Sequence, residues 1–283
     1  MWALKLLVVL VAIYAAVVLV AFAAQTWLLF PTSLAGGHAA LPRGAERVAL
    51  DTPDGERLQG VRIPPAAGTS EDRTVVLGFG GNAWNAEAMA TYLHELYPQA
   101  EVVAFHYRGY RPSTGRPSAA ALLEDGPLVY DFVSEGRDPA TIVAVGFSIG
   151  SGVAVHVARE RPIDGLVLVT PFDTLEQLAR QHYGWLPVGL LLRHRMSPLD
   201  ELRGVTAPLA LIAAERDTII PEQRTAPLRE AARTLIMDQT IPRAGHNDIY
   251  SDPEFAQAMR QAMKLIEERT TADRANDPAT GRD

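Results

Sequence analysis

The chain has 283 residues, enough for one large domain with short appendages, and 48% of them are hydrophobic, so a sizeable core can form. A net charge of −7 without a long basic run argues against a nucleic-acid partner, which would require a basic footprint. The sequence holds no cysteine, which excludes disulfides, thiolate metal sites and a cysteine nucleophile. Lys5 and Lys264 are the only lysines, and this preference for arginine indicates a GC-rich bacterial genome.

The first predicted element is an apolar helix near the N-terminus. Leu6–Ala24 contains no charged residue, and at about 1.5 Å per residue this stretch approaches the roughly 30 Å hydrocarbon core of a bilayer. Trp2 and Trp27 flank it, as amphipathic aromatic residues do at membrane interfaces. We therefore predict a membrane anchor over residues 1–30, and membrane lipid as a partner of this helix.

Two other interpretations of the apolar stretch stay open. Ala21-Phe22-Ala23 resembles the cleavage site of a signal peptide, although the apolar run exceeds the usual length and apolar residues resume at 27–30. The second interpretation is that the stretch forms a buried helix of a soluble protein. For an uncleaved anchor in a bacterial inner membrane, Lys5 favours a periplasmic position of the remaining chain, while Arg43 and Arg47 oppose it.

After a linker over residues 31–45, strand-like and helix-like segments alternate up to residue 269. Two short strands flank the turn signal Thr52-Pro53-Asp54-Gly55 and predict an antiparallel hairpin over 46–50 and 58–63. The later strands are predicted at 74–79, 101–105, 141–147, 164–170, 208–213 and 236–241. Most of these strands are apolar along nearly their whole length. Helical spacing falls between them, at 86–96, 118–134, 149–159, 222–235 and 253–269.

Apolar strands that alternate with helices predict an α/β fold with a mostly parallel, doubly wound sheet, here with the antiparallel hairpin at one edge. This domain spans 46–269 and follows one N-terminal transmembrane helix. The segment 172–197 breaks the alternation, and it is either a cap over a site or a packed connection. The polar tail over 270–283 is predicted to be disordered.

Gly146-Phe147-Ser148-Ile149-Gly150 follows a predicted strand directly and precedes a predicted helix. A nucleophile elbow has this G-x-S-x-G pattern in this setting, because a sharp turn needs small neighbours and lifts the serine above the sheet. The helix N-terminus also favours negative charge beside the hydroxyl. The alternative is a glycine-rich turn with a capping serine. We predict that Ser148 is a catalytic nucleophile.

A serine hydroxyl needs a base, and the base needs an orienting carboxylate. His246 lies in the loop between the last strand and the last helix, and His106, directly after a strand, is its nearest rival. Asp217 follows the strand at 208–213, with Asp173 as the rival acid. The chain order Ser148, Asp217, His246 is the order that accompanies a nucleophile elbow.

An oxyanion formed in acyl transfer needs backbone donors. We predict the N–H of Ile149, directly after the nucleophile, and the N–H of Asn82 in the loop after the strand at 74–79. Gly80 and Gly81 would let that loop approach a substrate carbonyl, and a simple Gly-Gly turn is the alternative. Asp248 is too close to His246 in sequence to orient it, and we expect it to turn the loop. This chemistry needs neither a metal nor an organic cofactor.

From about residue 74 to 250 the chain resembles the α/β-hydrolase superfamily, in its serine aminopeptidase and prolyl-oligopeptidase-like branch. Within it, the chain is similar to membrane-anchored bacterial hydrolases and to the eukaryotic ABHD-type depalmitoylases. The matching pieces are Gly80-Gly81-Asn82-Ala83, His106-Tyr107-Arg108-Gly109-Tyr110 with Ser113 and Gly115, the elbow, Pro171-Phe172, Glu215-Arg216-Asp217 with Pro221, Gly245-His246-Asn247, and the N-terminal apolar segment with Leu28-Leu29-Phe30-Pro31.

Two departures limit what this resemblance implies. Gly80 stands where many relatives carry histidine, so no histidine side chain is available there. The depalmitoylases carry an N-terminal cysteine cluster that this chain lacks, so their substrate is not implied. The prediction is a serine hydrolase that cleaves a carboxylic ester or thioester of a small or lipid-like acyl substrate. A serine peptidase of the same fold is the alternative, and a non-catalytic anchored scaffold is the alternative of another class.

Overall fold

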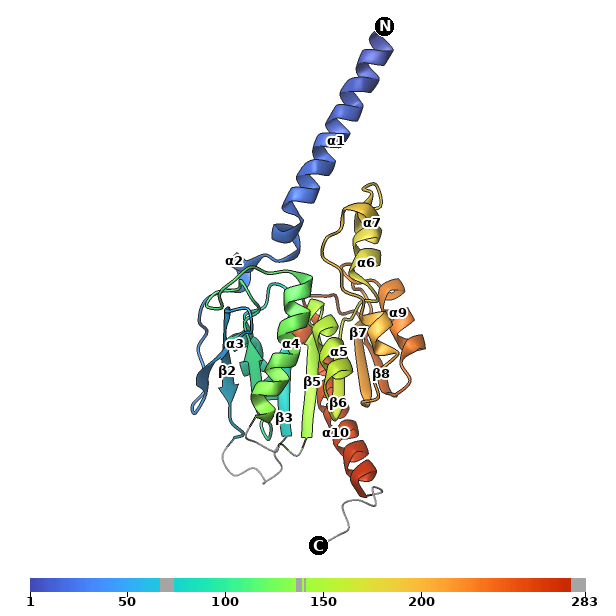
Figure 1. The fold of residues 1–283 in the computed structure, drawn as a ribbon. Helices are drawn as coiled ribbons and strands as arrows, with labels where there is room; N and C mark the ends of the chain where they lie inside the picture. Colours follow the sequence, from blue (N-terminus) through green and yellow to red (C-terminus); the bar gives the residue numbers. More distant parts are fainter. Residues whose placement is uncertain (67–73, 136–138, 140, 276–283) are drawn as a thin grey trace.

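The computed structural model describes residues 1–66, 74–135, 139 and 141–275, and Figure 1 shows their arrangement. An eight-stranded sheet forms the centre, in the order β1-β2-β4-β3-β5-β6-β7-β8. β1 pairs antiparallel with β2, and β2 antiparallel with β4, whereas all later pairs are parallel. The strands are β1 (Glu46–Asp51), β2 (Arg57–Ile63), β3 (Thr74–Phe79), β4 (Glu101–Phe105), β5 (Thr141–Phe147), β6 (Gly165–Val169), β7 (Leu209–Ala214) and β8 (Leu235–Ile241).

Helices cover both faces of this sheet. On one face, α3 (Ala86–Leu96) and α10 (Pro253–Ala275) bury side chains such as Met89 and Met259 in a common core. A second core on the other face joins α4, α5, α8 and α9 through residues that include Val129, Val153 and Leu228. Their bounds are α4 (Ala119–Ser134), α5 (Ile149–Glu160), α8 (Pro198–Leu202) and α9 (Glu222–Ala231). Every residue of β3, β5, β6 and β7 is buried, and this burial on both faces of the sheet explains the continuous apolar runs of these strands. The predicted fold class is confirmed.

Two helix ends differ from the sequence prediction. α9 stops at Ala231, four residues before the predicted end, because the carbonyl of Thr234 already accepts a hydrogen bond from the N–H of Leu209 in the sheet. α10 continues to Ala275, so the first six residues of the predicted tail over 270–283 are helical. Arg274 bonds Asp164 there, at 3.0 Å between Nη2 and Oδ1. The remaining tail, 276–283, lies outside the described residues.

The N-terminal helix α1 (Trp2–Leu29) projects from the sheet domain (Figure 1). It is long and apolar enough to cross a membrane, and none of its most apolar window is buried. Its large side chains, from Leu4 to Val20, are mostly exposed. A helix that is apolar on all sides and uncovered by protein is stable in lipid, not in water.

The segment predicted as a linker, 31–45, lies against the domain. It contains the single-turn helix α2 (Thr32–Ala35), and Ala35 is buried. The carboxylate of Glu87 on α3 accepts hydrogen bonds from the Ala39 N–H at 2.7 Å and from Arg47 Nε at 2.9 Å. Burial alone would raise the pKa of Glu87, but these bonds and that of His38 together lower it. The contact fixes the base of α1 relative to the sheet.

A buried ion pair holds the loop after β4 on α4. Arg108 donates from Nε to Asp125 Oδ2 at 3.1 Å, and its guanidinium also contacts Asp54 in the β1–β2 turn. The side chains of Arg108 and Asp125 are 9% and 5% exposed. The hydrogen bond raises the pKa of Arg108, so the guanidinium stays charged.

We expect Asp125→Ala to lower the free energy of unfolding by about 3–5 kcal/mol, because it leaves Arg108 charged and buried beside one exposed carboxylate. Asp131→Ala on the same helix is the control. Its pair with Arg161 is partly exposed, and its loss is expected to cost at most about 1 kcal/mol. Urea denaturation of both variants measures the difference, and equal losses would contradict the importance assigned to burial.

Candidate active site

Ser148 occupies a strained turn between β5 and α5. Its φ of 51° lies in the left-handed region, which a non-glycine residue adopts only where its surroundings enforce it. The Ser148 N–H donates to the carbonyl of Val169 at 3.0 Å, and its own carbonyl accepts from the N–H and the hydroxyl of Ser151 at 2.9 and 2.6 Å. These bonds lock the turn at the carboxyl end of β5.

The glycines of the elbow are required by close backbone contacts. A Cβ at Gly150 would lie 2.1 Å from the Phe79 carbonyl oxygen, and one at Gly146 would lie 2.5 Å from the Gly150 carbonyl oxygen. Real Cβ atoms do not approach other atoms so closely. The spacing of G-x-S-x-G therefore follows from how tightly α5 packs against β5 and β3.

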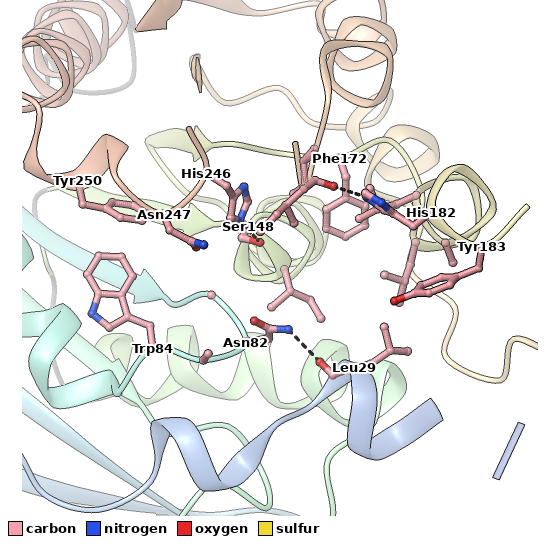
Figure 2. Close-up of a pocket in the computed structure, with 18 residues that line it drawn as sticks. Leu29, Asn82, Trp84, Ser148, Phe172, His182, Tyr183, His246, Asn247 and Tyr250 are labelled. Carbon is pink, nitrogen blue, oxygen red and sulfur yellow. Dashed lines mark hydrogen bonds between the residues drawn. The ribbon is translucent and has the colours of Figure 1, made fainter. Parts of the chain in front are cut away.

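His246 and Asp217 lie beside Ser148 in a chain of hydrogen bonds. His246 Nε2 is 3.1 Å from Ser148 Oγ, and its Nδ1 is 2.7 Å from Asp217 Oδ2. A carboxylate only accepts hydrogen bonds, so Nδ1 carries the proton and the Nε2 lone pair faces the serine hydroxyl. Figure 2 shows His246 directly next to Ser148 in the cavity.

Asp217 is held rigidly after β7. Its Oδ1 accepts the backbone N–H groups of Ile219 and Ile220 at 2.9 and 2.7 Å, which leaves Oδ2 for the imidazole. The Asp217 side chain is 2% exposed and that of His246 is 8% exposed. Water therefore competes little for the bond between them, and the carboxylate fixes both the tautomer and the orientation of the ring.

The rival residues named from the sequence have other contacts. The backbone N–H of His106 bonds the Gln59 carbonyl at 2.8 Å, and burial lowers the pKa of its imidazole to about 4. Asp173 accepts from the Thr174 N–H at 2.6 Å and pairs with Arg224 at 3.1 Å. Asp248 accepts the Gly245 N–H at 2.6 Å and so turns the loop that carries His246.

A cavity of about 470 Å³ opens in front of Ser148, and Asn82 and Ile149 line it together with His246. The β3–α3 loop reaches Ser148, since a Cβ at Gly81 would lie 3.7 Å from Ser148 Cβ. The side-chain amide of Asn82 instead turns to α1, where Nδ2 donates to the Leu29 carbonyl at 3.1 Å (Figure 2). The backbone N–H groups of Asn82 and Ile149 as oxyanion donors stay predictions.

The segment 172–197 forms α6 (Leu175–His182) and α7 (Val188–Leu191), and α6 contributes to one wall of the cavity. Leu29, at the end of α1, lines the cavity too, and sequence reasoning did not place it there. The run Leu28-Leu29-Phe30-Pro31 was the available signal, because apolar residues after an anchor need a surface to cover them. The remaining apolar lining includes Trp84, Phe172, Leu178, Ala179, Tyr183 and Tyr250. Among the described residues, no group of three or more His, Asp or Glu side chains could hold a metal ion.

No protein-family model matches the sequence. The chain is 34% identical over 224 residues to Rv2307c of Mycobacterium tuberculosis, which covers 77% of this chain and 79% of that protein. Among solved structures, the Pyrococcus furiosus esterase Pf2001 matches 84% of this chain and 97% of its own, with a TM-score of 0.65 and 19% identity.

The chain belongs to the same family as Rv2307c, and its fold is that of the α/β-hydrolase superfamily. It is also 25% identical over 191 residues to the zebrafish lysophosphatidylserine lipase ABHD12, across 58% of this chain and 50% of that protein. The expected resemblance to α/β hydrolases and the likeness to ABHD-type hydrolases are thus confirmed. In this superfamily the strand–turn–helix around Ser148 is the site of a nucleophile elbow.

We expect Gly150→Ala to destabilise the protein by about 1–3 kcal/mol, because the new methyl group overlaps the Phe79 carbonyl and must push α5 away from β3. A displacement of the elbow by about 1 Å would also lower any turnover at Ser148 by roughly 100-fold. Gly81→Ala is the control, since its Cβ meets only ordinary contacts. Thermal unfolding of both variants tests this, and an unchanged Gly150→Ala protein would refute it.

Proposed function

We propose that the protein is a serine hydrolase that cleaves a carboxylic ester or thioester. The observation that carries this proposal is the continuous hydrogen-bond chain from Ser148 Oγ through His246 to Asp217, at 3.1 and 2.7 Å. This hydrogen-bond chain begins at a strained strand–helix turn and faces a cavity, as covalent catalysis by serine requires. A capping serine in an ordinary turn would have no need of a buried imidazole and carboxylate behind it.

In the acylation step, His246 Nε2 removes the proton of the Ser148 hydroxyl while Oγ attacks the substrate carbonyl carbon. Asp217 stabilises the resulting imidazolium without taking its proton. The tetrahedral intermediate collapses, the ester bond to the leaving group breaks, and His246 gives its proton to the leaving oxygen or sulfur. Water, activated by the same imidazole, then releases the carboxylic acid and restores Ser148.

The negative charge of the intermediate needs donors that are already in place. The proposal assigns this role to the backbone N–H groups of Asn82 and Ile149. It is supported by the positions of both residues around the cavity and by the N-terminus of α5, whose dipole favours an anion beside Ser148. The bond from the Asn82 side chain to Leu29 supports it further, because it holds the loop at a fixed distance from Ser148.

The substrate in this proposal is a small or lipid-like acyl ester. The lining of the cavity is mainly aliphatic and aromatic, with few polar groups besides Ser148, His246 and the two asparagines. The name of ABHD12, a lysophosphatidylserine lipase, supports an ester of a lipid more than a peptide. A peptidase would show turnover of peptide amides, and a non-catalytic scaffold would show no turnover at all.

The proposed location is a bacterial inner membrane, crossed once by α1, with the catalytic domain on the periplasmic side. The exposed helix α1, which carries no charge from Leu6 to Ala24, supports insertion. Lys5 on the short N-terminal side supports a cytoplasmic N-terminus. An anchored hydrolase would meet its substrate at the membrane surface.

Replacement of the nucleophile and of the orienting acid should have separate, large effects. We expect Ser148→Ala to abolish labelling by a fluorophosphonate probe together with hydrolysis of p-nitrophenyl butyrate. Asp217→Asn should keep the geometry but lower kcat by about 10⁴-fold, because the amide can no longer hold the required tautomer. Probe labelling and steady-state kinetics measure both effects.

Asp173→Asn is the matched control, since Asp173 is also a buried carboxylate after a strand of the same sheet but pairs with Arg224. Its kcat should stay within about tenfold of the wild type. Labelling that persists in Ser148→Ala would overturn the nucleophile. A larger loss for Asp173→Asn than for Asp217→Asn would reassign the acid.

The orientation can be tested because the chain holds no cysteine. Lys264 on α10 is exposed, so Lys264→Cys introduces a single reactive thiol on the catalytic domain. We expect a membrane-impermeant maleimide to label this variant in bacterial cells whose inner membrane is intact. Cells with permeabilised inner membranes give the full labelling level, and labelling restricted to them would mean a cytoplasmic domain.

A further inference from the structure

A second cavity lies between the membrane helix and the segment that follows β6. Its volume is about 230 Å³, and its walls are Ala21, Phe22, Gln25, Leu28 and Leu29 of α1 together with residues of 179–192. We call it the anchor groove, and we call the segment 172–197 the cap. No charged side chain lines the groove. In Figure 1, α6 and α7 rise from the sheet domain on the same side as α1.

Hydrogen bonds fix the two walls of the anchor groove to each other. Gln25 donates from Nε2 to the Leu191 carbonyl at 3.2 Å, and its Oε1 accepts the Arg193 N–H at 2.8 Å. Higher on α1, the Tyr14 hydroxyl donates to the Trp185 carbonyl at 3.0 Å. Below them, Thr26 Oγ1 lies 2.8 Å from His194 Nε2. The groove therefore has built walls along about three turns of α1.

The anchor groove adjoins the catalytic cavity. Leu29, Ala179 and Tyr183 line both spaces. Figure 2 shows Leu29 and Tyr183 at the side of the catalytic cavity that faces α6. Ala179 is the smallest of the three, so among these side chains it is the least obstacle to an extended molecule that occupies both spaces.

The chemistry of the groove selects an apolar occupant. Gln25 is its only polar side chain apart from the aromatic hydroxyl and indole groups, and both ends of its amide are already hydrogen-bonded to backbone. Ala21 and Phe22 belong to the uncharged stretch that would lie in hydrocarbon. The groove thus begins at residues that would lie beside lipid acyl chains and ends at Leu29, which also lines the cavity in front of Ser148.

The tip of the cap has the same surface character as α1. Tyr183, Trp185 and Leu190 are 52%, 57% and 88% exposed, although they are large and apolar or amphipathic. Aromatic residues of this kind are stable at the boundary between headgroups and hydrocarbon. The bond from Tyr14 to the Trp185 carbonyl places this tip beside the apolar part of the anchor, where a bilayer would cover it.

We propose that the anchor groove binds the acyl chain of a membrane lipid and delivers the ester carbonyl of that lipid to Ser148. This inference rests on the proposed function and deepens it, because it makes the membrane helix a wall of the substrate site. From Ala21 to Leu29 the groove follows α1 for about 12 Å, so it holds a chain and not only a short acyl group. Long-chain esters are the preferred substrates for this reason.

The test places a bulky side chain at the far end of the groove. We expect Ala21→Trp in the full-length protein to lower kcat/KM for p-nitrophenyl palmitate in mixed micelles by at least about tenfold, since the indole fills the space of the chain end. Hydrolysis of p-nitrophenyl butyrate should stay within about twofold. Ala179→Trp, at the connection to the catalytic cavity, should reduce turnover already for p-nitrophenyl octanoate.

Ala23→Trp is the matched control, because Ala23 lies on the same helix two residues further on, is exposed and lines neither cavity. It should leave the chain-length profile of the wild type unchanged. If Ala21→Trp and Ala23→Trp both keep wild-type palmitate turnover, the acyl-chain assignment is overturned and the groove is a packing surface. If the wild type hydrolyses neither butyrate nor palmitate and takes no probe at Ser148, the proposed function itself fails.

Discussion

The close approach of α5 to the end of β3 is the contact on which the rest of the site depends. Gly150 lies so near the Phe79 carbonyl that no side chain fits between them. This contact forces the chain to reverse within one residue, and Ser148 takes the left-handed backbone conformation that the reversal requires. The same approach brings the β3–α3 loop next to Ser148, so the proposed nucleophile and the predicted oxyanion loop are positioned by one packing constraint.

The positions of the proposed acid, Asp217, and the proposed base, His246, depend less directly on this packing. Asp217 and His246 are carried by the loops after β7 and β8, which lie further along the order of strands from β5. Their positions are fixed by backbone bonds, from Ile219 and Ile220 to Asp217 and from Arg216 N–H to the Ala244 carbonyl at 2.8 Å. The imidazole is therefore oriented by groups that do not touch Ser148, which lets the loops vary in sequence while the hydrogen-bond chain is kept.

The sequence was sufficient to predict the sheet, the elbow and the residues that meet at it, because each carries a local signal. Apolar strands, small residues around Ser148, and polar residues after strand ends have patterns that a single sequence displays. The packing of α1 on the cap has no such pattern. It uses the backbone carbonyls of Trp185 and Leu191, which any residue could offer. α6 and α7 have eight and four residues, too few for a clear helical period.

The anchor is therefore more than a tether for the sheet domain. Leu29 is at once the last residue of α1, a wall of the cavity in front of Ser148 and, through its carbonyl, the partner of Asn82 in the β3–α3 loop. A fragment without α1 would lose that partner, open one side of the cavity and expose the apolar surface of the cap to water. Since the residues that line the cavity in front of Ser148 come from both α1 and the sheet domain, the proposed specificity for acyl esters would be set where the two meet. The position of Ser148 is set by the sheet, and the shape of the space before it is completed by Leu29 at the end of α1.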